Sequence, residues 1–285
     1  MDFRVAFSIF GFDVYWYGIV IAVAMASAVA LSARRFAERG GDREVIYDGA
    51  LVVLALAIVG ARLYHVFSEY NDGTPGWSYY RVHPLEILNL RSGGLGIFGG
   101  VLGGIAGAFV LSAWKRVPMW QLADAIGPAL LLGQAIGRWG NYFNQELYGG
   151  PTGSSWFGIR IDASARVAPY GDMAQFPPEA RFHPTFLYEC IWNLVGLALL
   201  TWIERRFGSE RPNGRLRRGD MMAGYLLWYG FGRMLLESTL RVDAFTYTTG
   251  GLPTGVLFAA GWIIGGVALL ALARVRRSAG AAPQL

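Results

Sequence analysis

The sequence predicts an all-α polytopic membrane protein with about seven transmembrane helices. Of its 285 residues, 54% are hydrophobic and only 16% are charged. A soluble domain of this length seldom carries so few charges. Several apolar segments are also long enough to cross the hydrocarbon core of a bilayer. The single cysteine, Cys190, excludes an intrachain disulfide framework and a CxxC metal site.

We expect the helices at roughly 14–33, 47–67, 93–113, 119–137, 183–203, 219–239 and 253–273. Residues 1–285 then form a single integral membrane domain. Between the fourth and fifth helices, the stretch 150–182 is rich in Pro, Gly, Ser and charges, and we expect it to form a small extracytoplasmic cap. Within this cap, residues 156–161 are a candidate short strand.

The basic residues predict the orientation of the helices. Fifteen lie in one set of alternating connections, against eight in the other, longer set. The first set is Arg34, Arg35, Arg39, Arg43, Lys115, Arg116, Arg205, Arg206, Arg211, Arg215, Arg217, Arg218, Arg274, Arg276 and Arg277; the second is Arg4, Arg81, Arg91, Arg138, Arg160, Arg166, Arg181 and Arg241. Because short cytoplasmic loops are enriched in Lys and Arg, the N-terminus is expected outside and the C-terminus in the cytoplasm.

The first three helices carry two features beyond their apolar character. Arg62 and His65 share a face near the outer end of the second helix, where a charge points into the bundle or a wet cavity. Arg62 has two open roles, a structural ion pair or a ligand contact. The third helix contains two ladders of glycines spaced by four, Gly96/Gly100/Gly104 and Gly99/Gly103/Gly107, which let neighbouring helices approach closely or form a groove for acyl chains.

The fourth helix leads into the segment on which the functional prediction is centred. Gln134, Arg138, Asn141 and Gln145 follow at helical spacing and would share one face. Such a face can hold a phosphate or glycerol head group through a guanidinium fork and amide donors. The alternative is an interfacial arginine that reaches water beside aromatic anchors.

The fifth and sixth helices add further polar groups near the same surface. The fifth helix is expected to begin at His183, which is either a structural donor or a proton acceptor. On the sixth helix, Tyr229, Arg233 and Glu237 recur every four residues on one face. Arg233 and Glu237 can satisfy each other, yet a second arginine beside Arg138 is what a phosphate clamp requires.

Several chemistries are excluded by the residues. There is no HExxH pair for a zinc protease, no GxSxG nucleophile elbow, and no Walker A or GxGxxG element for a nucleotide. We therefore expect no metal and no cofactor. The net charge of +5 comes from residues between apolar segments, so membrane topology explains it and no nucleic-acid partner is expected.

The motif at 137–146, GRWGNYFNQE, resembles the signature of bacterial prolipoprotein diacylglyceryl transferases. Supporting matches are Trp16-Tyr17-Gly18, Gly60-Ala61-Arg62, Gly93-Gly94-Leu95 with Gly99-Gly100, the stretch 183–189 (HPTFLYE), and the stretch 229–233 (YGFGR). The resemblance implies seven membrane helices, an outward N-terminus and a periplasmic cap. It also implies residence in the bacterial cytoplasmic (inner) membrane.

The reaction implied by this resemblance moves the diacylglyceryl group of phosphatidylglycerol onto the lipobox cysteine thiol of a preprolipoprotein, forming a thioether and releasing glycerol 1-phosphate. The partners are then phosphatidylglycerol, the signal peptides of preprolipoproteins, and membrane lipids. By position, Arg138 and Asn141 correspond to phospholipid-contacting residues, and Tyr17, Glu146, Gly149 and Arg233 correspond to essential neighbours. We expect four residues to be catalytic, namely Arg138, Arg233, Glu146 and Tyr17. Further candidate contacts with phosphatidylglycerol are Asn144, Gly149, Arg62, Tyr229 and Glu237.

One departure from the family pattern concerns the proton acceptor. Many members have a His-Gly-Gly sequence where this chain has Phe98-Gly99-Gly100, and phenylalanine cannot accept a proton. The substrate thiol still needs activation by a cation or a base, because its ordinary pKa is about 8.5. Glu146 and His183 remain alternatives for the base.

Two other functions compete with the transferase. A transporter or channel for a small anion would also use paired arginines, although such proteins often show internal repeats and this sequence has no convincing one. A non-catalytic scaffold packed through the glycine-rich helix leaves the dense polar segment at 134–149 without a role.

Overall fold

The computed structural model describes residues 4–68, 74–90, 93–208, 214–242, 248–249 and 251–280. It divides into two compact units, a first unit of residues 1–31 and 123–285 and a second unit of residues 32–122. Of the basic residues that predict the orientation, Arg91 and Arg211 lie outside the described residues. The side chains of Arg276 and Arg277 lie outside the described part as well.

Seven helices of 19 residues or more lie in the described part of the chain. They are α1 (Trp16–Glu38), α2 (Arg43–Phe67), α4 (Ile97–Lys115), α5 (Met119–Asn144), α6 (Thr185–Phe207), α7 (Asp220–Thr239) and α8 (Thr254–Gly280). Five of them, α1, α2, α4, α6 and α8, are long and apolar enough to cross a membrane. The protein is therefore mostly helical, with five candidate membrane spans.

The other two long helices, α5 and α7, form where the sequence predicts membrane helices but are less apolar. Their interiors carry the polar side chains of the expected site, among them Gln134 and Arg138 on α5 and Arg233 and Glu237 on α7. Polar residues inside a membrane bundle usually face its interior. Low hydropathy in these two helices thus accompanies the polar residues of the expected site.

Three small antiparallel two-stranded sheets accompany the helices in the described part of the chain. A hairpin of β1 (Val5–Ile9) and β2 (Phe12–Tyr15) precedes α1, so this helix begins later than expected. β3 (Ile159–Arg160) pairs with β4 (Arg181–Phe182) in the cap, which makes the strand shorter than the expected 156–161. The third pair is β5 (Thr248–Thr249) with β6 (Leu252–Pro253). Short α3 (Trp77–Tyr80), η1 (Pro84–Leu88) and η3 (Ala163–Ala165) complete the chain.

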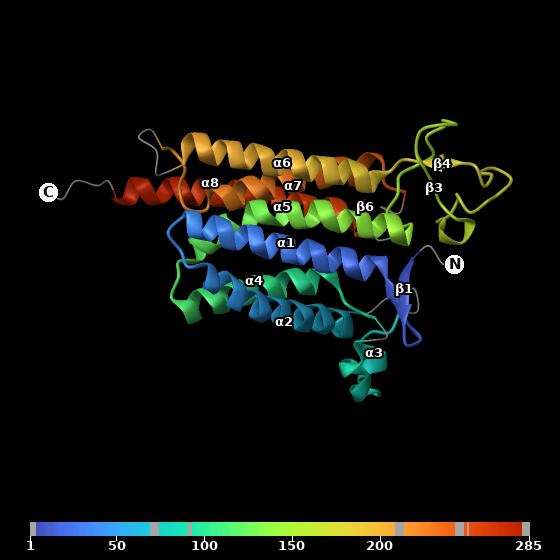
Figure 1. Ribbon diagram of the computed structural model, residues 1–285, viewed down its shortest axis with the longest axis horizontal. Helices are drawn as coiled ribbons and strands as arrows, with labels where there is room; N and C mark the ends of the chain where they lie inside the picture. The colour runs from blue at the N-terminus through green and yellow to red at the C-terminus, as the bar shows by residue number, and fades with distance from the viewer. Residues whose placement is uncertain are drawn as a thin grey trace. The chain divides into compact units, whose positions relative to one another are not determined.

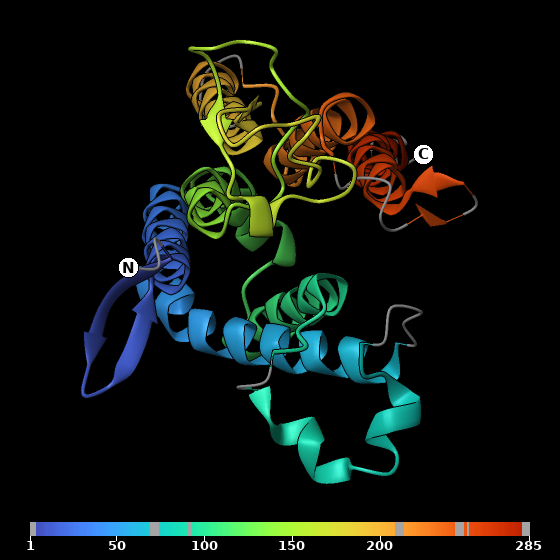
Figure 2. The ribbon, with the colours of Figure 1, turned by 90° about the vertical axis from the view of Figure 1, so that its right-hand side faces the viewer.

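The second unit is built on a close crossing of α2 and α4, which lie side by side in Figure 2. A Cβ atom added to Gly99 would lie 2.1 Å from the carbonyl oxygen of Gly60, and one added to Gly103 would lie 2.1 Å from that of Leu56. By contrast, Gly104 faces open space. The ladder of Gly99, Gly103 and Gly107 is therefore the packing face, and α4 begins at Ile97 rather than at Gly93 as expected.

In the first unit, α5 is the central element to which the other helices are fixed. Its buried Asp124 accepts hydrogen bonds from the backbone N–H groups of Gly219 (2.7 Å), Met221 (3.0 Å) and Met222 (3.1 Å). The first turn of a helix has free N–H groups and a positive dipole end, so this carboxylate caps α7 from a neighbouring helix. The cap fixes where α7 begins relative to α5.

The cap is held by a small core and one buried arginine. Tyr148, Ile161 and Phe182 form its buried cluster. Arg166 donates hydrogen bonds to the carbonyls of Ile161 (2.8 Å) and Phe176 (2.6 Å) and lies over the Phe182 ring. Figure 1 shows β3 and β4 at the same end of α5 and α6 as the β1–β2 hairpin.

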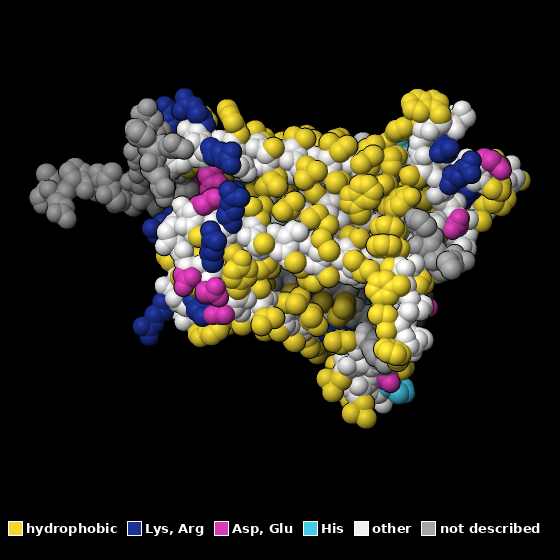
Figure 3. Space-filling view, in the orientation of Figure 1, with side chains coloured by type: hydrophobic (Ala, Val, Ile, Leu, Met, Phe, Trp, Pro, Cys, Tyr) yellow, Lys and Arg dark blue, Asp and Glu magenta, His cyan; other side chains and the backbone are white. Residues whose placement is uncertain are grey.

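The surface of the helices suits a lipid environment. On the face shown in Figure 3, hydrophobic side chains cover the middle stretches of the helices, while charged side chains gather near helix ends. Large apolar residues such as Leu51, Leu102 and Ile264 are exposed. Contiguous exposed apolar surface of this kind marks a membrane-facing protein.

Candidate active site

The site is built around the end of α5, which continues two turns beyond the expected boundary at residue 137. The helix runs to Asn144, so Arg138, Asn141 and Asn144 project from one continuous helix. Gln145 does not share their face as expected. It has a positive φ of 54° just past the helix end, and its side chain pairs with Asp162 of the cap.

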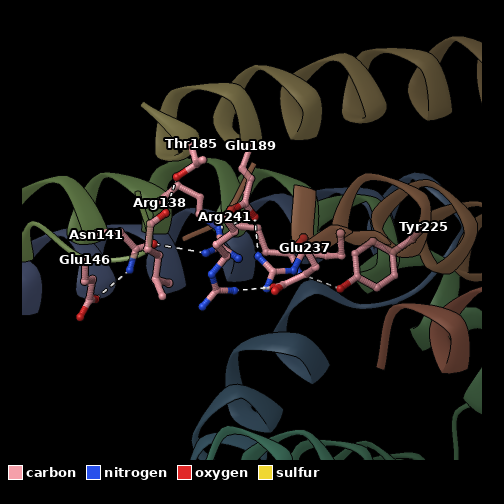
Figure 4. Close-up of polar contacts among 11 residues, drawn as sticks. Arg138, Asn141, Glu146, Thr185, Glu189, Tyr225, Glu237 and Arg241 are labelled. Carbon is pink, nitrogen blue, oxygen red and sulfur yellow. Dashed lines mark hydrogen bonds and ion pairs between the residues drawn. The ribbon is translucent and has the colours of Figure 1, made fainter. Parts of the chain in front are cut away.

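Arg138 and Arg233 meet on a single carboxylate oxygen. The Nε atom of Arg138 on α5 lies 3.0 Å from Oε2 of Glu189 on α6, and Nη1 of Arg233 on α7 lies 2.9 Å from the same atom. Both arginine side chains are 15% exposed, and that of Glu189 is 5% exposed. Figure 4 shows Arg138 and Glu189 among the polar contacts of this site. Two guanidinium groups from separate helices thus bind one anionic oxygen.

The same network continues along α7. Glu237 accepts hydrogen bonds from both Arg233 and Arg241, each four residues away, and its side chain is 2% exposed. The carboxylate also packs against Gly255 in the first turn of α8, where the helix dipole favours a negative charge. We refer to Arg138, Glu189, Arg233, Glu237 and Arg241 as the ionic cluster.

Arg138 also connects to Glu146 through an asparagine. Its Nη1 donates to Oδ1 of Asn141 at 3.2 Å, and Nδ2 of Asn141 donates to Oε1 of Glu146 at 2.8 Å. Asn144 approaches the same carboxylate oxygen more loosely, at 3.4 Å. Glu146 lines a pocket of about 160 Å³ together with Asn144 and Arg4. The structure therefore brings four residues of the central motif into one chain of contacts.

Tyr17 lies against this segment from α1. A Cβ added to Gly140 would lie 2.8 Å from the Tyr17 ring, so only glycine leaves room for it. The neighbouring Trp16 stacks on Phe143 at 5.3 Å. The motif's second glycine thus lets Tyr17 pack directly on the backbone of α5.

Tyr229 lies one turn before Arg233 on α7 and stacks on Tyr225 with an interplanar angle of 9°. The Tyr225 hydroxyl accepts a hydrogen bond of 2.8 Å from Nε2 of Gln134. This bond joins α5 and α7 one turn away from the ionic cluster. Because Tyr229 stacks on Tyr225, this hydrogen bond also links Tyr229 to α5.

Gly149 and His183 form a structural junction. A Cβ on Gly149 would lie 2.7 Å from that of His183 and 3.1 Å from the carbonyl oxygen of Leu240. The backbones of Gly149 and Arg241 form an isolated β-bridge. Thr185 donates a hydrogen bond to the carbonyl of Leu147. Gly149 therefore holds Arg241 beside the end of α5, and Nδ1 of His183 faces the Tyr188 hydroxyl at 2.9 Å.

Arg62 belongs to the second unit and has a different environment from the ionic cluster. Its guanidinium donates five hydrogen bonds to the carbonyls of Glu86, Ile87, Asn89, Gly93 and Gly94, at 2.6 to 3.2 Å. An arginine has five N–H donors, which matches this number of bonds. The partners are backbone carbonyls rather than the ion pair considered from the sequence, and the expected lipid contact stays a prediction. His65 faces the hydroxyl of Tyr80 at 3.2 Å.

Sequence reasoning missed Glu189 and Arg241 as members of the site. Glu189 ends the HPTFLYE motif, and a carboxylate inside a membrane helix implies a cationic partner. Arg241 follows Glu237 by four residues, the spacing of an ion pair on one helix. Both signals were present in the sequence.

The arrangement is suited to binding an oxyanion. Preorganised guanidinium groups in a site shielded from water stabilise negative charge strongly. Among the residues that the structure describes, no three side chains of His, Cys, Asp and Glu gather where they could hold a metal ion. The chemistry available is therefore anion binding by arginines beside carboxylate, amide and tyrosine groups.

Comparison with known proteins identifies the family. The sequence model described as prolipoprotein diacylglyceryl transferase matches residues 4–272. The chain is 39% identical to the phosphatidylglycerol–prolipoprotein diacylglyceryl transferase of Chloroflexus aggregans, over 85% of this chain and 78% of that protein. It is 38% identical to the protein of the same name from Leifsonia xyli, over 91% and 74%, and 38% identical to that of Geobacillus kaustophilus, over 81% and 78%. The protein belongs to the prolipoprotein diacylglyceryl transferase family.

Proposed function

We propose that this protein transfers the diacylglyceryl group of phosphatidylglycerol to the lipobox cysteine of a preprolipoprotein, the first step of lipoprotein maturation. The observation that carries the proposal is the meeting of Arg138 and Arg233 on one oxygen of Glu189. An anionic oxygen at that position is what a lipid phosphate offers. The names of the relatives give the same donor and acceptor, and they do not favour anion transport.

In this reaction, the cysteine sulfur attacks the glycerol carbon that bears the phosphate, and the C–O bond to the phosphate breaks. The thiol proton leaves, a thioether forms, and glycerol 1-phosphate departs with additional negative charge. Arg138 and Arg233 are proposed to bind the phosphate oxygens. Because charge grows on these oxygens, the guanidinium groups stabilise the transition state more than the bound lipid.

The remaining site residues are given supporting roles in this proposal. Asn141, Asn144 and Tyr229 contact the lipid head group, while Glu237 holds Arg233 and Gly149 holds the backbone at Arg241. Tyr17 closes the site from α1.

For the proton acceptor, we favour Glu146 over His183. Glu146 is linked to Arg138 through Asn141. The ring of His183 is already engaged with Tyr188.

We further propose that the chain lies in the bacterial cytoplasmic (inner) membrane as one integral domain of seven spans. The two less apolar helices, α5 and α7, would cross the membrane with their polar faces turned inward. The excess of basic residues in one set of connections favours an outward N-terminus, an outward cap at residues 150–182 and a cytoplasmic C-terminus.

The function is tested with purified protein in phosphatidylcholine vesicles that contain phosphatidylglycerol. A synthetic lipobox peptide is added, and mass spectrometry measures the thioether product. We expect product with the cysteine peptide and none with the matching serine peptide or without phosphatidylglycerol. Absence of product, in vesicles where a related transferase is active, would reject the proposal.

A further inference from the structure

Two amide side chains lie one helical turn from the ionic cluster, on the side away from the cap. Gln134 precedes Arg138 by four residues on α5, and Asn193 follows Glu189 by four residues on α6. Each amide is thus displaced about 6 Å along its helix axis from its ionic neighbour. Further along the same helices, Leu131 and Leu200 pack into an apolar cluster.

Asn193 is buried without a hydrogen-bond partner. The residue is 1% exposed, and neither Nδ2 nor Oδ1 has a partner among the described residues. Burying an unpaired amide destabilises a protein, whereas an apolar side chain at this position would carry no such cost. An amide in this place therefore points to a hydrogen bond that forms in another state of the protein.

Lipid binding creates such a state, if the proposed function is correct. The N–H groups of Arg138 and Arg233 that now bind Glu189 are the groups that would bind the lipid phosphate. Glu189 then loses both partners while it remains buried. A buried carboxylate that loses its partner strongly destabilises a protein, so Glu189 needs a new donor.

We propose that the side-chain amide of Asn193 donates a hydrogen bond to the Glu189 carboxylate when Arg138 and Arg233 bind lipid phosphate. Side chains four residues apart on a helix are neighbours, with Cβ atoms about 5–6 Å apart. Side chains on a helix also lean toward its N-terminus, so Asn193 leans toward Glu189. Its Nδ2 can donate to the carboxylate.

Gln134 is already engaged with a different partner. Its Nε2 already donates to the hydroxyl of Tyr225 at 2.8 Å. The atom left without a partner is Oε1, which accepts hydrogen bonds and so offers nothing to a carboxylate. Asn193 is thus a positioning residue, because it acts on the lipid through Glu189 and the two arginines.

The test measures the affinity for phosphatidylglycerol, which can be read even in inactive variants. Asn193→Leu removes the amide at similar volume, and Asn193→Asp keeps the shape but removes the donor. The control is Thr201→Val, another polar-to-apolar change on α6. Radiolabelled phosphatidylglycerol is titrated into the full-length proteins in phosphatidylcholine nanodiscs. We expect a Kd about tenfold higher or more for both Asn193 variants, and a Kd within about twofold of wild type for Thr201→Val.

The same titrations in a Glu189→Gln background separate this role from a general structural one. In this background residue 189 is a neutral amide, which needs no new donor when the arginines bind lipid. Asn193→Leu is therefore expected to leave the Kd for phosphatidylglycerol unchanged there, because coupled residues give non-additive changes. Wild-type affinity in Asn193→Leu and Asn193→Asp, or an equal loss with and without Glu189→Gln, would overturn the proposal. Thermal unfolding checks folding, and Asn193→Leu is expected to melt at or above wild type. Transfer by wild-type protein, assayed in parallel, shows separately whether the proposed function holds.

Discussion

Arg138 occupies the centre of the site at the scale of single residues. It contacts Glu189 on α6 and Asn141 on its own helix, and through Asn141 it reaches Glu146. A guanidinium is suited to this position because its planar fork binds several oxygens at once. Lysine offers the same charge without the fork.

We expect Arg138→Ala to lower kcat/KM by about a hundredfold or more, the loss of roughly 3 kcal/mol typical of one preorganised donor. Arg138→Lys should fall between this variant and wild type. The control is Arg34→Ala on α1, whose side chain is 66% exposed and pairs with Glu38 at the surface. Turnover of Arg138→Ala at the wild-type rate would remove this residue from the mechanism.

Arg62 is a buried arginine whose hydrogen-bond acceptors are backbone carbonyls. Its five hydrogen bonds end on the carbonyls of Glu86, Ile87, Asn89, Gly93 and Gly94. A Cβ on Gly94 would lie 2.6 Å from the Arg62 guanidinium, so the glycine lets the backbone approach. The arginine therefore supplies hydrogen-bond donors to these carbonyls.

Arg62→Met is expected to leave these carbonyls without donors and to destabilise the protein by about 1–3 kcal/mol or more. Thermal unfolding in detergent measures this effect. If Arg62 instead contacts the lipid, as considered from the sequence, Arg62→Met should raise the KM for phosphatidylglycerol and leave the melting temperature unchanged. The two measurements together decide between these roles.

At the scale of helices, a reciprocal pair of tryptophans sets α6 against α7. Nε1 of Trp192 donates to the carbonyl of Trp228 at 3.1 Å, and Nε1 of Trp228 donates to that of Trp192 at 2.9 Å. The rings stack at 4.4 Å. Each indole covers a glycine on the opposite helix, Gly232 or Gly196. This pairing holds α6 and α7 in the register that places Glu189 beside Arg233.

Trp192→Phe and Trp228→Phe each remove one of these hydrogen bonds and should each destabilise the protein by about 1 kcal/mol. Trp202→Phe on α6 is the matched control, because Trp202 is 58% exposed. Gly196→Ala should be more harmful, since its Cβ would lie 2.2 Å from Nε1 of Trp228. Chemical denaturation in detergent gives the comparison. Equal stability of Trp228→Phe and Trp202→Phe would contradict the role of the pair.

At the scale of the whole molecule, the placement of charge along the chain predicts the topology. The β1–β2 hairpin and the cap belong to segments poor in basic residues, and the α6–α7 connection is rich in them. Figure 1 shows the hairpin and the cap at one end of the first unit and the C-terminal end of α6 at the other.

A cysteine-accessibility experiment tests this orientation. In a Cys190→Ser background, Phe10→Cys in the hairpin, where Phe10 is 97% exposed, should react with a membrane-impermeant maleimide in intact spheroplasts. Gly214→Cys, between α6 and α7, should react only after permeabilisation. The reverse pattern would invert the proposed topology.

The sequence by itself determined the class of the protein and the position of its main segments. Apolar runs predict the positions of all seven long helices within several residues, and five of these helices are long and apolar enough to cross a membrane. The central motif predicted Arg138, Asn141 and Glu146 as neighbours, since residues close in sequence lie close in space. Helix ends were less well predicted. α5 continues to Asn144 and ends where Gln145 adopts a positive φ of 54°.

Only the tertiary structure decided which distant residues meet. Glu189 and Arg233 are 44 residues apart, and no periodicity within one helix reveals that they face each other. Their contact depends on the register of α6 and α7, which the capping of α7 by Asp124 and the tryptophan pair determine across helices. The same holds for Arg62, whose carbonyl partners lie 24 to 32 residues away along the chain. The sequence supplies the chemistry of each side chain, but the partner that each charge finds depends on packing between segments that are remote along the chain.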